Sequence, residues 1–175
     1  MSCGEKLYVL AWVSMSNPPS APPDAAVASV VSFAELGRRI LHGEVPPPPI
    51  ARLIGFRIVA LESGRAVFEL DTDLERHANP MGTLHGGILC DLADAAMGFA
   101  YASTLDAGDT FTTLELKMNF LRPVWQTRLL ATARVFHAGR TVGLLECDVI
   151  DAQERLVARA SSTCMTLRGA DARGR

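Results

Sequence analysis

The spacing of hydrophobic and polar residues changes along the chain. From Gly86 to about Ser103 apolar residues recur every three or four positions, which predicts one long helix. At 100° per residue, one side of this helix collects the residues that we expect to pack on a sheet: Ile88, Leu92, Ala95, Ala96 and Phe99. Gly87, Asp94 and Gly98 fall on a different flank, where two glycines suit close approach by another backbone.

Elsewhere the apolar residues alternate with a period of two, which predicts strands. The clearest case is 112–121, where Leu114, Leu116, Met118 and Phe120 alternate with polar residues. Short turns separate the other expected strands and favour antiparallel pairing; these strands are 56–61, 65–70, 127–137, 141–150 and 156–167. One long helix with about five to six strands predicts an α+β domain.

The residues before this domain have a different composition. Residues 14–24 are rich in Pro and Ser and predict a linker, and residues 25–41 predict a helix with Asp24 as its N-cap. Pro46 to Pro49 then predict an extended spacer. We therefore expect an N-terminal extension over 1–45, a folded domain over 46–168 and a flexible polar tail over 169–175.

Composition excludes several classes of function. The net charge of −2 and the scattered basic residues predict no nucleic-acid or membrane partner. The apolar stretch 7–13 is too short to span a bilayer and is interpreted as a leader segment rather than a secretory signal. The four cysteines (Cys3, Cys90, Cys147 and Cys164) form no CxxC motif, so we expect reduced thiols and a cytoplasmic protein. The four histidines are far apart and form no HExxH motif, so no metal site is expected.

The start of the long helix carries the candidate chemistry. Gly86 and Gly87 leave the first N–H groups of the helix bare, so they can receive an oxyanion or a polarised carbonyl. Asp94 lies two turns after Gly87, on the same face. A polarising amide and a carboxylate are two parts of an acyl-transfer site. Asp91 is also off the expected buried stripe, and we interpret it as a helix-dipole partner.

The residues around this helix start resemble a known signature. His85-Gly86-Gly87-x6-Asp94, preceded by Asn79 and Gly82, is similar to the motif of PaaI-like hotdog-fold acyl-CoA thioesterases, and the resemblance covers about residues 46–168. It implies a long central helix wrapped by a curved antiparallel sheet, hydrolysis of an acyl-CoA thioester, and no cofactor. It also implies a homodimer or homotetramer whose sites combine the helix start of one subunit with the Asp of its neighbour.

The resemblance also implies roles for single residues. The Gly86 amide would polarise the thioester carbonyl, with Gly87 as the alternative donor. Asp94 would act as nucleophile or as general base, and the sequence leaves both routes open. Asn79 and Thr113 would orient the substrate and the attacking water, although each is also explained as a loop cap or an ordinary strand residue.

Two further residues and two further functions stay open. His85 is expected to position the helix start beside bound substrate rather than to act as a base. Arg140, in a predicted hairpin turn, would either meet a phosphate of CoA or be solvated. A hotdog acyl-CoA hydratase or dehydratase and a non-catalytic acyl-CoA-binding domain are the alternative functions. Asp94 lies on the helix without a paired catalytic His, which argues against a hydratase or dehydratase. The presence of Asp94 itself argues against a non-catalytic domain.

Overall fold

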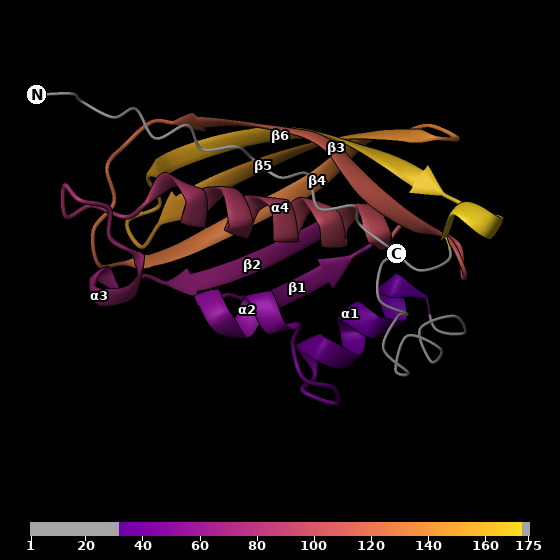
Figure 1. Cartoon of the computed structure of the whole chain (residues 1–175), viewed down its shortest axis with the longest axis horizontal. Coiled ribbons are helices and arrows are strands. Elements are labelled where there is room, and N and C mark those ends of the chain that lie inside the picture. Colours follow the sequence, from indigo (N-terminus) through magenta and orange to yellow (C-terminus); the bar gives the residue numbers. More distant parts are fainter. Residues whose placement is uncertain (1–31, 173–175) are drawn as a thin grey trace, which may run out of the picture.

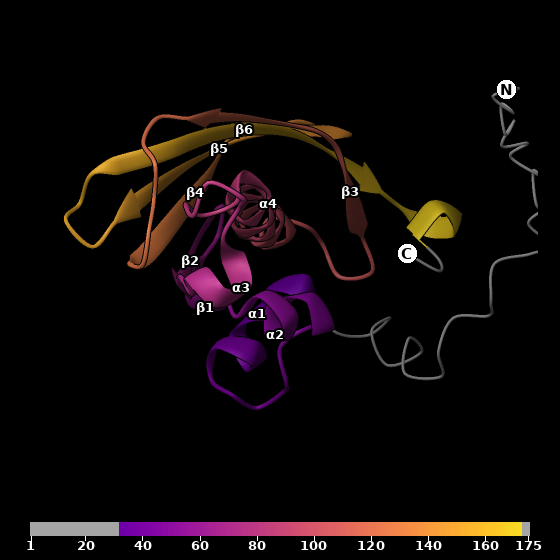
Figure 2. The same cartoon turned by 60° about the vertical axis from the view of Figure 1, so that its left-hand side comes forward.

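A six-stranded antiparallel sheet forms the framework of the protein in the computed structural model, which describes residues 32–172. The strands occur in the spatial order β1-β2-β4-β5-β6-β3, so β1 and β3 are the two edges. Their bounds are β1 (Arg57–Glu62), β2 (Arg65–Asp71), β3 (Thr110–Phe120), β4 (Arg128–Ala138), β5 (Val142–Asp151) and β6 (Leu156–Leu167). The sheet curls, and Figure 2 shows β3, β6 and β5 arching over one long helix. This confirms the α+β class that the sequence pattern predicted and the hotdog fold that the resemblance implied.

The long helix α4 (Gly86–Ala102) lies in the concave face of the sheet and is buried on most sides (Figures 1 and 2). Ala93 and Met97, which are outside the predicted apolar stripe, are 0% exposed. Ala95 is only partly buried, as are two other members of that stripe. The prediction of a single buried side was therefore wrong, because a curled sheet covers a helix over more than one face.

The surroundings of Gly98 differ from the prediction that another backbone approaches the glycine-bearing flank of this helix. A Cβ built on Gly98 would lie 3.1 Å from Cζ of Phe111. The close neighbour of this glycine is thus an aromatic ring of β3 in the same chain. No second backbone from another subunit is needed to explain it.

Short helices cover the open side of α4. α1 (Phe33–Leu41) contacts β1 and α4, and α2 (Pro49–Ile54) follows the proline run. The hydroxyl of Ser32 caps α1 by accepting a hydrogen bond from the Glu35 N–H at 3.2 Å. The predicted cap Asp24 and the helical residues 25–31 lie outside the described residues, as do Cys3, the stretch 7–13, the linker 14–24 and 173–175.

Two further short elements lie where the sequence predicted irregular structure. α3 (Leu74–His77) occupies the predicted loop 71–81, with Asp73 as its N-cap. A 3-10 helix, Gly169–Ala172, begins the predicted polar tail. No helix among residues 32–172 combines the length and the apolar character that crossing a bilayer requires.

Edge strand β3 presents apolar side chains to the outside of the single chain. Leu114 and Phe120 are 53% and 55% exposed, although both belong to the alternating apolar face of the strand. The register with β6 shifts between Thr113 and Glu115, which bends the strand at this point. An open edge that also exposes apolar side chains is typical of a strand that pairs with another chain.

Candidate functional site

Asp94 and Thr113 meet where α4 crosses β3. The Thr113 hydroxyl donates a hydrogen bond to Asp94 Oδ1 at 3.1 Å. Asp94 is exposed in the single chain, because the curled sheet and the short helices leave this flank of α4 uncovered. The hydrogen bond fixes one carboxylate oxygen and leaves Oδ2 available to a reacting group. Thr113 therefore lies beside the carboxylate of Asp94, a contact that the sequence did not specify.

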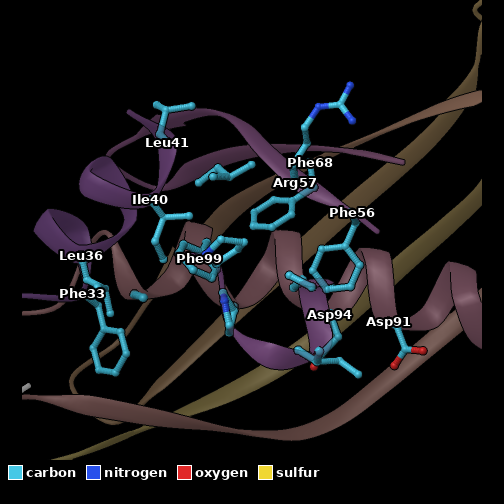
Figure 3. Close-up of a pocket in the computed structure, with 18 of the residues that line it drawn as sticks. Phe33, Leu36, Ile40, Leu41, Phe56, Arg57, Phe68, Asp91, Asp94 and Phe99 are labelled. Atoms are coloured by element: carbon cyan, nitrogen blue, oxygen red, sulfur yellow. The ribbon is translucent and has the colours of Figure 1, made fainter. Parts of the chain in front are cut away.

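Both residues line a cavity of about 680 Å³. Figure 3 shows Asp94 and Asp91 toward one end of this cavity and Phe33, Leu36 and Ile40 of α1 toward the other. The walls between them are largely apolar and include Ala95, Gly98, Phe56, Phe68, Phe99 and Phe111. The volume lies within the roughly 300–1,000 Å³ that is typical of small-molecule sites. An apolar chamber therefore opens next to a carboxylate.

Asp91 lines the same cavity one helical turn before Asp94. Partial burial raises the pKa of the Asp91 carboxyl, and the neighbouring Asp94 charge raises that pKa further. Burial, with the charges of Asp91 and Asp94, also raises the pKa of the thiol of Cys90, the residue before Asp91. The sequence predicts a purely structural role for Asp91. Its position shows that it contributes to the electrostatics of the cavity.

The helix start lies in a second cavity, of about 360 Å³. Asn79, Gly86 and Phe120 line it together with residues 121–124. Among residues 32–172, no backbone or side-chain acceptor pairs with the Gly86 N–H. The N-cap His85 has an extended backbone, with φ −67° and ψ 131°, and makes no side-chain cap. The first amide of α4 is therefore available to an external acceptor.

Asn79 holds the loop that leads into α4. Its Oδ1 accepts hydrogen bonds from the N–H groups of Met81 at 2.9 Å and Thr83 at 3.2 Å. Its Nδ2 donates to Thr83 Oγ1 at 2.9 Å. These bonds match the loop-cap interpretation of Asn79. Asn79 itself lines the cavity of Gly86 and does not line the cavity of Asp94.

The two parts of the predicted site are separated within one chain. Gly86 and Asp94 are eight residues apart on α4, so they lie about 12 Å apart along the helix axis at 1.5 Å per residue. They also line different cavities. One thioester carbonyl cannot contact both groups of a single chain. The arrangement fits a site that two chains complete together.

The other predicted binding residues lie in different places. The His85 ring packs over Gly87, since a Cβ built on Gly87 would lie 3.0 Å from His85 Cδ2. Arg140 lies in the turn between β4 and β5, is exposed and lines neither cavity. That hairpin adjoins the end of α4, because Gly143 contacts Tyr101. The structure thus does not bring Arg140 to the helix start of the same chain. Nowhere in the described part of the chain do three His, Cys, Asp or Glu side chains gather as a group able to hold a metal ion.

Part of the cavity wall is not predicted by the sequence. The sequence predicts a spacer over Pro46 to Pro49, but Pro46, Pro47 and Pro48 line the cavity beside Asp94. The helix predicted before this run also lines the cavity, although no such role was predicted for it. The available signal was the spacing of Phe33, Leu36 and Ile40, which places three apolar side chains on one face.

Comparison with known proteins gives this arrangement a context. Residues 81–158 match the family model described as the thioesterase superfamily. The chain is 33% identical over 109 residues to the acyl-coenzyme A thioesterase PaaI of Escherichia coli, covering 62% of this chain and 75% of the relative. It is 32% identical over 104 residues to the 1,4-dihydroxy-2-naphthoyl-CoA hydrolase of Listeria monocytogenes, covering 59% and 84%.

Solved structures agree with these sequence relatives. The PaaI protein from the phenylacetic acid degradation operon of E. coli superposes with a TM-score of 0.69 at 26% identity. That match covers 79% of this chain and 98% of the other. The chain belongs to the thioesterase superfamily, in its PaaI-like hotdog group, and it is a hydrolase.

Proposed function

We propose that this protein hydrolyses an acyl-CoA thioester to a free carboxylic acid and CoA, with Asp94 as its reacting carboxylate. The observation that carries the proposal is the pairing of Asp94 with Thr113 at the mouth of an apolar cavity. Its relatives act on CoA thioesters by their names. A thioester is already an activated acyl group, so the reaction needs no cofactor.

The helix start would supply the electrophilic half of the site. The unpaired Gly86 N–H would donate to the thioester carbonyl oxygen, with the Gly87 N–H as the alternative donor, and the α4 dipole would favour the negative charge that develops there. Asn79 would stabilise the conformation of the loop 79–83 through its hydrogen bonds with Thr83. It would also orient the thioester, since it lines the same cavity as Gly86. His85 would define where the helix begins.

Asp94 would supply the other half by one of two routes. As a general base, it would take a proton from a water whose oxygen attacks the carbonyl carbon. As a nucleophile, it would form an acyl-aspartyl anhydride that a water then cleaves. In both routes the C–S bond breaks, CoA leaves as a thiolate and water supplies its proton. Thr113 would hold the carboxylate at the angle that either route requires.

We infer a homodimer, or a tetramer built from it, as the active form. The separation of Gly86 from Asp94 along α4 requires two chains for one site, and the exposed apolar edge of β3 offers a contact surface. The free thiols of Cys90, Cys147 and Cys164 support a reducing, cytoplasmic location. Arg140 remains a candidate for contact with a CoA phosphate of a substrate bound mainly by the neighbouring subunit.

The test is release of the CoA thiol from an acyl-CoA panel by the purified protein, followed with a thiol reagent. We expect saturable turnover that produces one free acid for each thiol. Tight binding of an acyl-CoA without turnover would instead identify a non-catalytic binding domain. Addition of water across an enoyl-CoA, with the thioester kept, would identify a hydratase.

A further inference from the structure

The cavity beside Asp94 extends away from the carboxylate and beneath α1. Its polar residues are few: Asp91, Asp94, Thr113 and Arg57. The Arg57 side chain points outward in Figure 3, and its guanidinium pairs with Glu69 and Asp71. The far end is formed by Phe33, Leu36 and Ile40 of α1 and by the prolines 46–48. A group placed there would exchange contacts with water for contacts with these apolar side chains.

Helix α1, which closes this end of the cavity, packs tightly against its neighbours. A Cβ built on Gly37 would lie 2.5 Å from Leu61 Cδ2 and 3.2 Å from Phe99 Cδ1, so α1 packs closely on β1 and α4. The ring of Phe33 meets the ring of Phe111 edge to face, with centroids 6.3 Å apart. Ser32 caps the helix. α1 is therefore a packed wall, and its side chains define the depth of the cavity.

We propose that α1 and the proline segment 46–48 form the end wall of the acyl-binding chamber and set the size of the acyl group that the protein accepts. The proposal rests on the function proposed above and adds the substrate class, which is a bulky apolar acyl group, alkyl or aryl. The chamber of about 680 Å³ is far larger than an acetyl group requires. Hydrocarbon fills such a volume more favourably than water does, because the apolar walls offer water few hydrogen-bond partners.

The experiment compares acetyl-, octanoyl-, dodecanoyl- and phenylacetyl-CoA as substrates of the full chain. The wild type should favour octanoyl- or phenylacetyl-CoA over acetyl-CoA in kcat/KM by at least ~10-fold, the scale of apolar pocket discrimination. Octanoyl and phenylacetyl serve as separate arms, so the preference between them distinguishes an alkyl from an aryl substrate. A preference for acetyl-CoA would overturn the proposal.

Two variants test the wall directly. Leu36→Trp adds volume inside the chamber and should lower kcat/KM for octanoyl-CoA by at least ~10-fold, while the value for acetyl-CoA stays within about 2-fold. Arg38→Trp, on the exposed face of the same helix, adds the same ring outside the chamber and should change neither. Ile40→Ala enlarges the chamber and should raise the ratio of dodecanoyl- to octanoyl-CoA turnover. Melting temperatures identify a variant that fails to fold.

A binding measurement separates this proposal from the proposed function. S-octyl-CoA is a thioether that cannot be hydrolysed, and its dissociation constant is measurable by calorimetry. If S-octyl-CoA binds Leu36→Trp ~10-fold more weakly than the wild type and binds Arg38→Trp with unchanged affinity, the result supports the proposed end wall even if no thioester is hydrolysed. A different result would overturn the proposed end wall but leave the thioesterase function standing. In that result the wild type turns over both substrates, and folded Leu36→Trp loses kcat/KM equally for acetyl- and octanoyl-CoA.

Discussion

The Thr113 hydroxyl donates to Asp94 Oδ1 at 3.1 Å and so joins strand β3 to the middle of helix α4. The same strand carries the exposed apolar side chains Leu114 and Phe120 along the open edge of the sheet. A reacting carboxylate would then lie next to the surface through which a second subunit is expected to attach. Catalysis and assembly would depend on one strand.

The first prediction concerns the Asp94 carboxylate. Asp94→Asn keeps the size of the side chain and removes both the nucleophile and the base, so kcat for a competent acyl-CoA should fall by at least ~10²-fold. The melting temperature should change little, because Asp94 is exposed in the single chain. Steady-state kinetics with a thermal melt provides the measurement.

Two other acids serve as comparisons for Asp94. Asp106→Asn changes an exposed acid outside both cavities and should leave kcat unchanged. Asp91→Asn changes the acid that shares the cavity, and it should keep most activity because Thr113 orients only Asp94. Near-normal turnover in folded Asp94→Asn would refute the assignment.

The second prediction isolates one N–H group. Gly86 is the first residue of α4, a position where proline fits the helical backbone and removes the amide hydrogen. The extended backbone of His85 also suits a residue before proline. If this amide polarises the carbonyl, Gly86→Pro should lower kcat by about 10²–10³-fold, the loss that follows removal of one oxyanion donor.

Gly86→Ala is the matched control for that substitution. It adds a Cβ that would lie 3.0 Å from the Phe120 ring, as proline also does, but it keeps the N–H. The contact is with the far end of the Phe120 ring, which is exposed in the single chain and can turn aside. Equal activity of the two folded variants would exclude the Gly86 amide as the donor to the thioester carbonyl and would favour the Gly87 amide.

The third prediction tests the shared site through mixed subunits. Asp94→Asn and Gly86→Pro chains carry different affinity tags, and the mixed dimer is purified through both. If each site takes its amide from one chain and its carboxylate from the other, one site of the mixed dimer is intact and about half of the wild-type activity returns. If both groups come from the same chain, every site is damaged and the mixture stays inactive. A monomeric mass for the wild type by light scattering would contradict the shared site before any subunits are mixed.

The sequence predicted the sheet and the long helix well, because both have strong periodic patterns. The last strand, β6, has the predicted bounds, and α4 begins at the predicted Gly86. α3 was missed because four residues are too few to show a period. The one-sided view of α4 was wrong because helical periodicity cannot show how far a sheet curls around the helix.

The candidate site was predictable only where chemistry and spacing coincide. Asp94 became a candidate from its position two turns after Gly87 and from the resemblance of the His85-to-Asp94 spacing to the family motif, and the structure places Thr113 next to it. The wall formed by Ile40 and the prolines 46–48 was not predicted, since it depends on α1 packing against elements distant in sequence. The position of Asp91 in the same cavity also depends on this tertiary arrangement.

The fourth prediction concerns packing at the far end of α4. A Cβ built on Gly143 would lie 2.1 Å from Cε2 of Tyr101, a fully buried ring whose hydroxyl is 2.7 Å from Thr166 Oγ1. Gly143→Ala should therefore lower the free energy of unfolding by about 1–3 kcal/mol, the typical cost of overpacking. Tyr101→Phe removes only the hydrogen bond and should cost about 1 kcal/mol. Urea unfolding at equal protein concentration measures both, and an unchanged Gly143→Ala midpoint would show that the ring can move.

The last prediction concerns stability at acid pH. Arg159 donates two hydrogen bonds to Asp148, at 2.6 Å and 2.8 Å, and Arg134 lies 4.0 Å away. The Arg159 hydrogen bonds and charge, with a smaller contribution from Arg134, hold the pKa of the Asp148 carboxyl below its usual range despite partial burial. A carboxyl with a lowered pKa in the folded state stabilises the fold above its unfolded pKa, and this contribution disappears as the pH falls through the folded value.

Asp148→Asn should therefore reduce the free energy of unfolding by roughly 0.5–1 kcal/mol at about pH 7, the upper range for a partly exposed ion pair. The difference from the wild type should shrink as the pH falls below about 4, because the wild-type carboxyl is then increasingly protonated and becomes neutral like the Asn of the variant. Asp106→Asn, whose side chain pairs with no basic group among the described residues, should show no such trend. Urea unfolding at several pH values and one protein concentration provides the measurement. A difference that stays constant with pH would mean that the Asp148 contacts act through packing and hydrogen bonding, without a contribution from its charge.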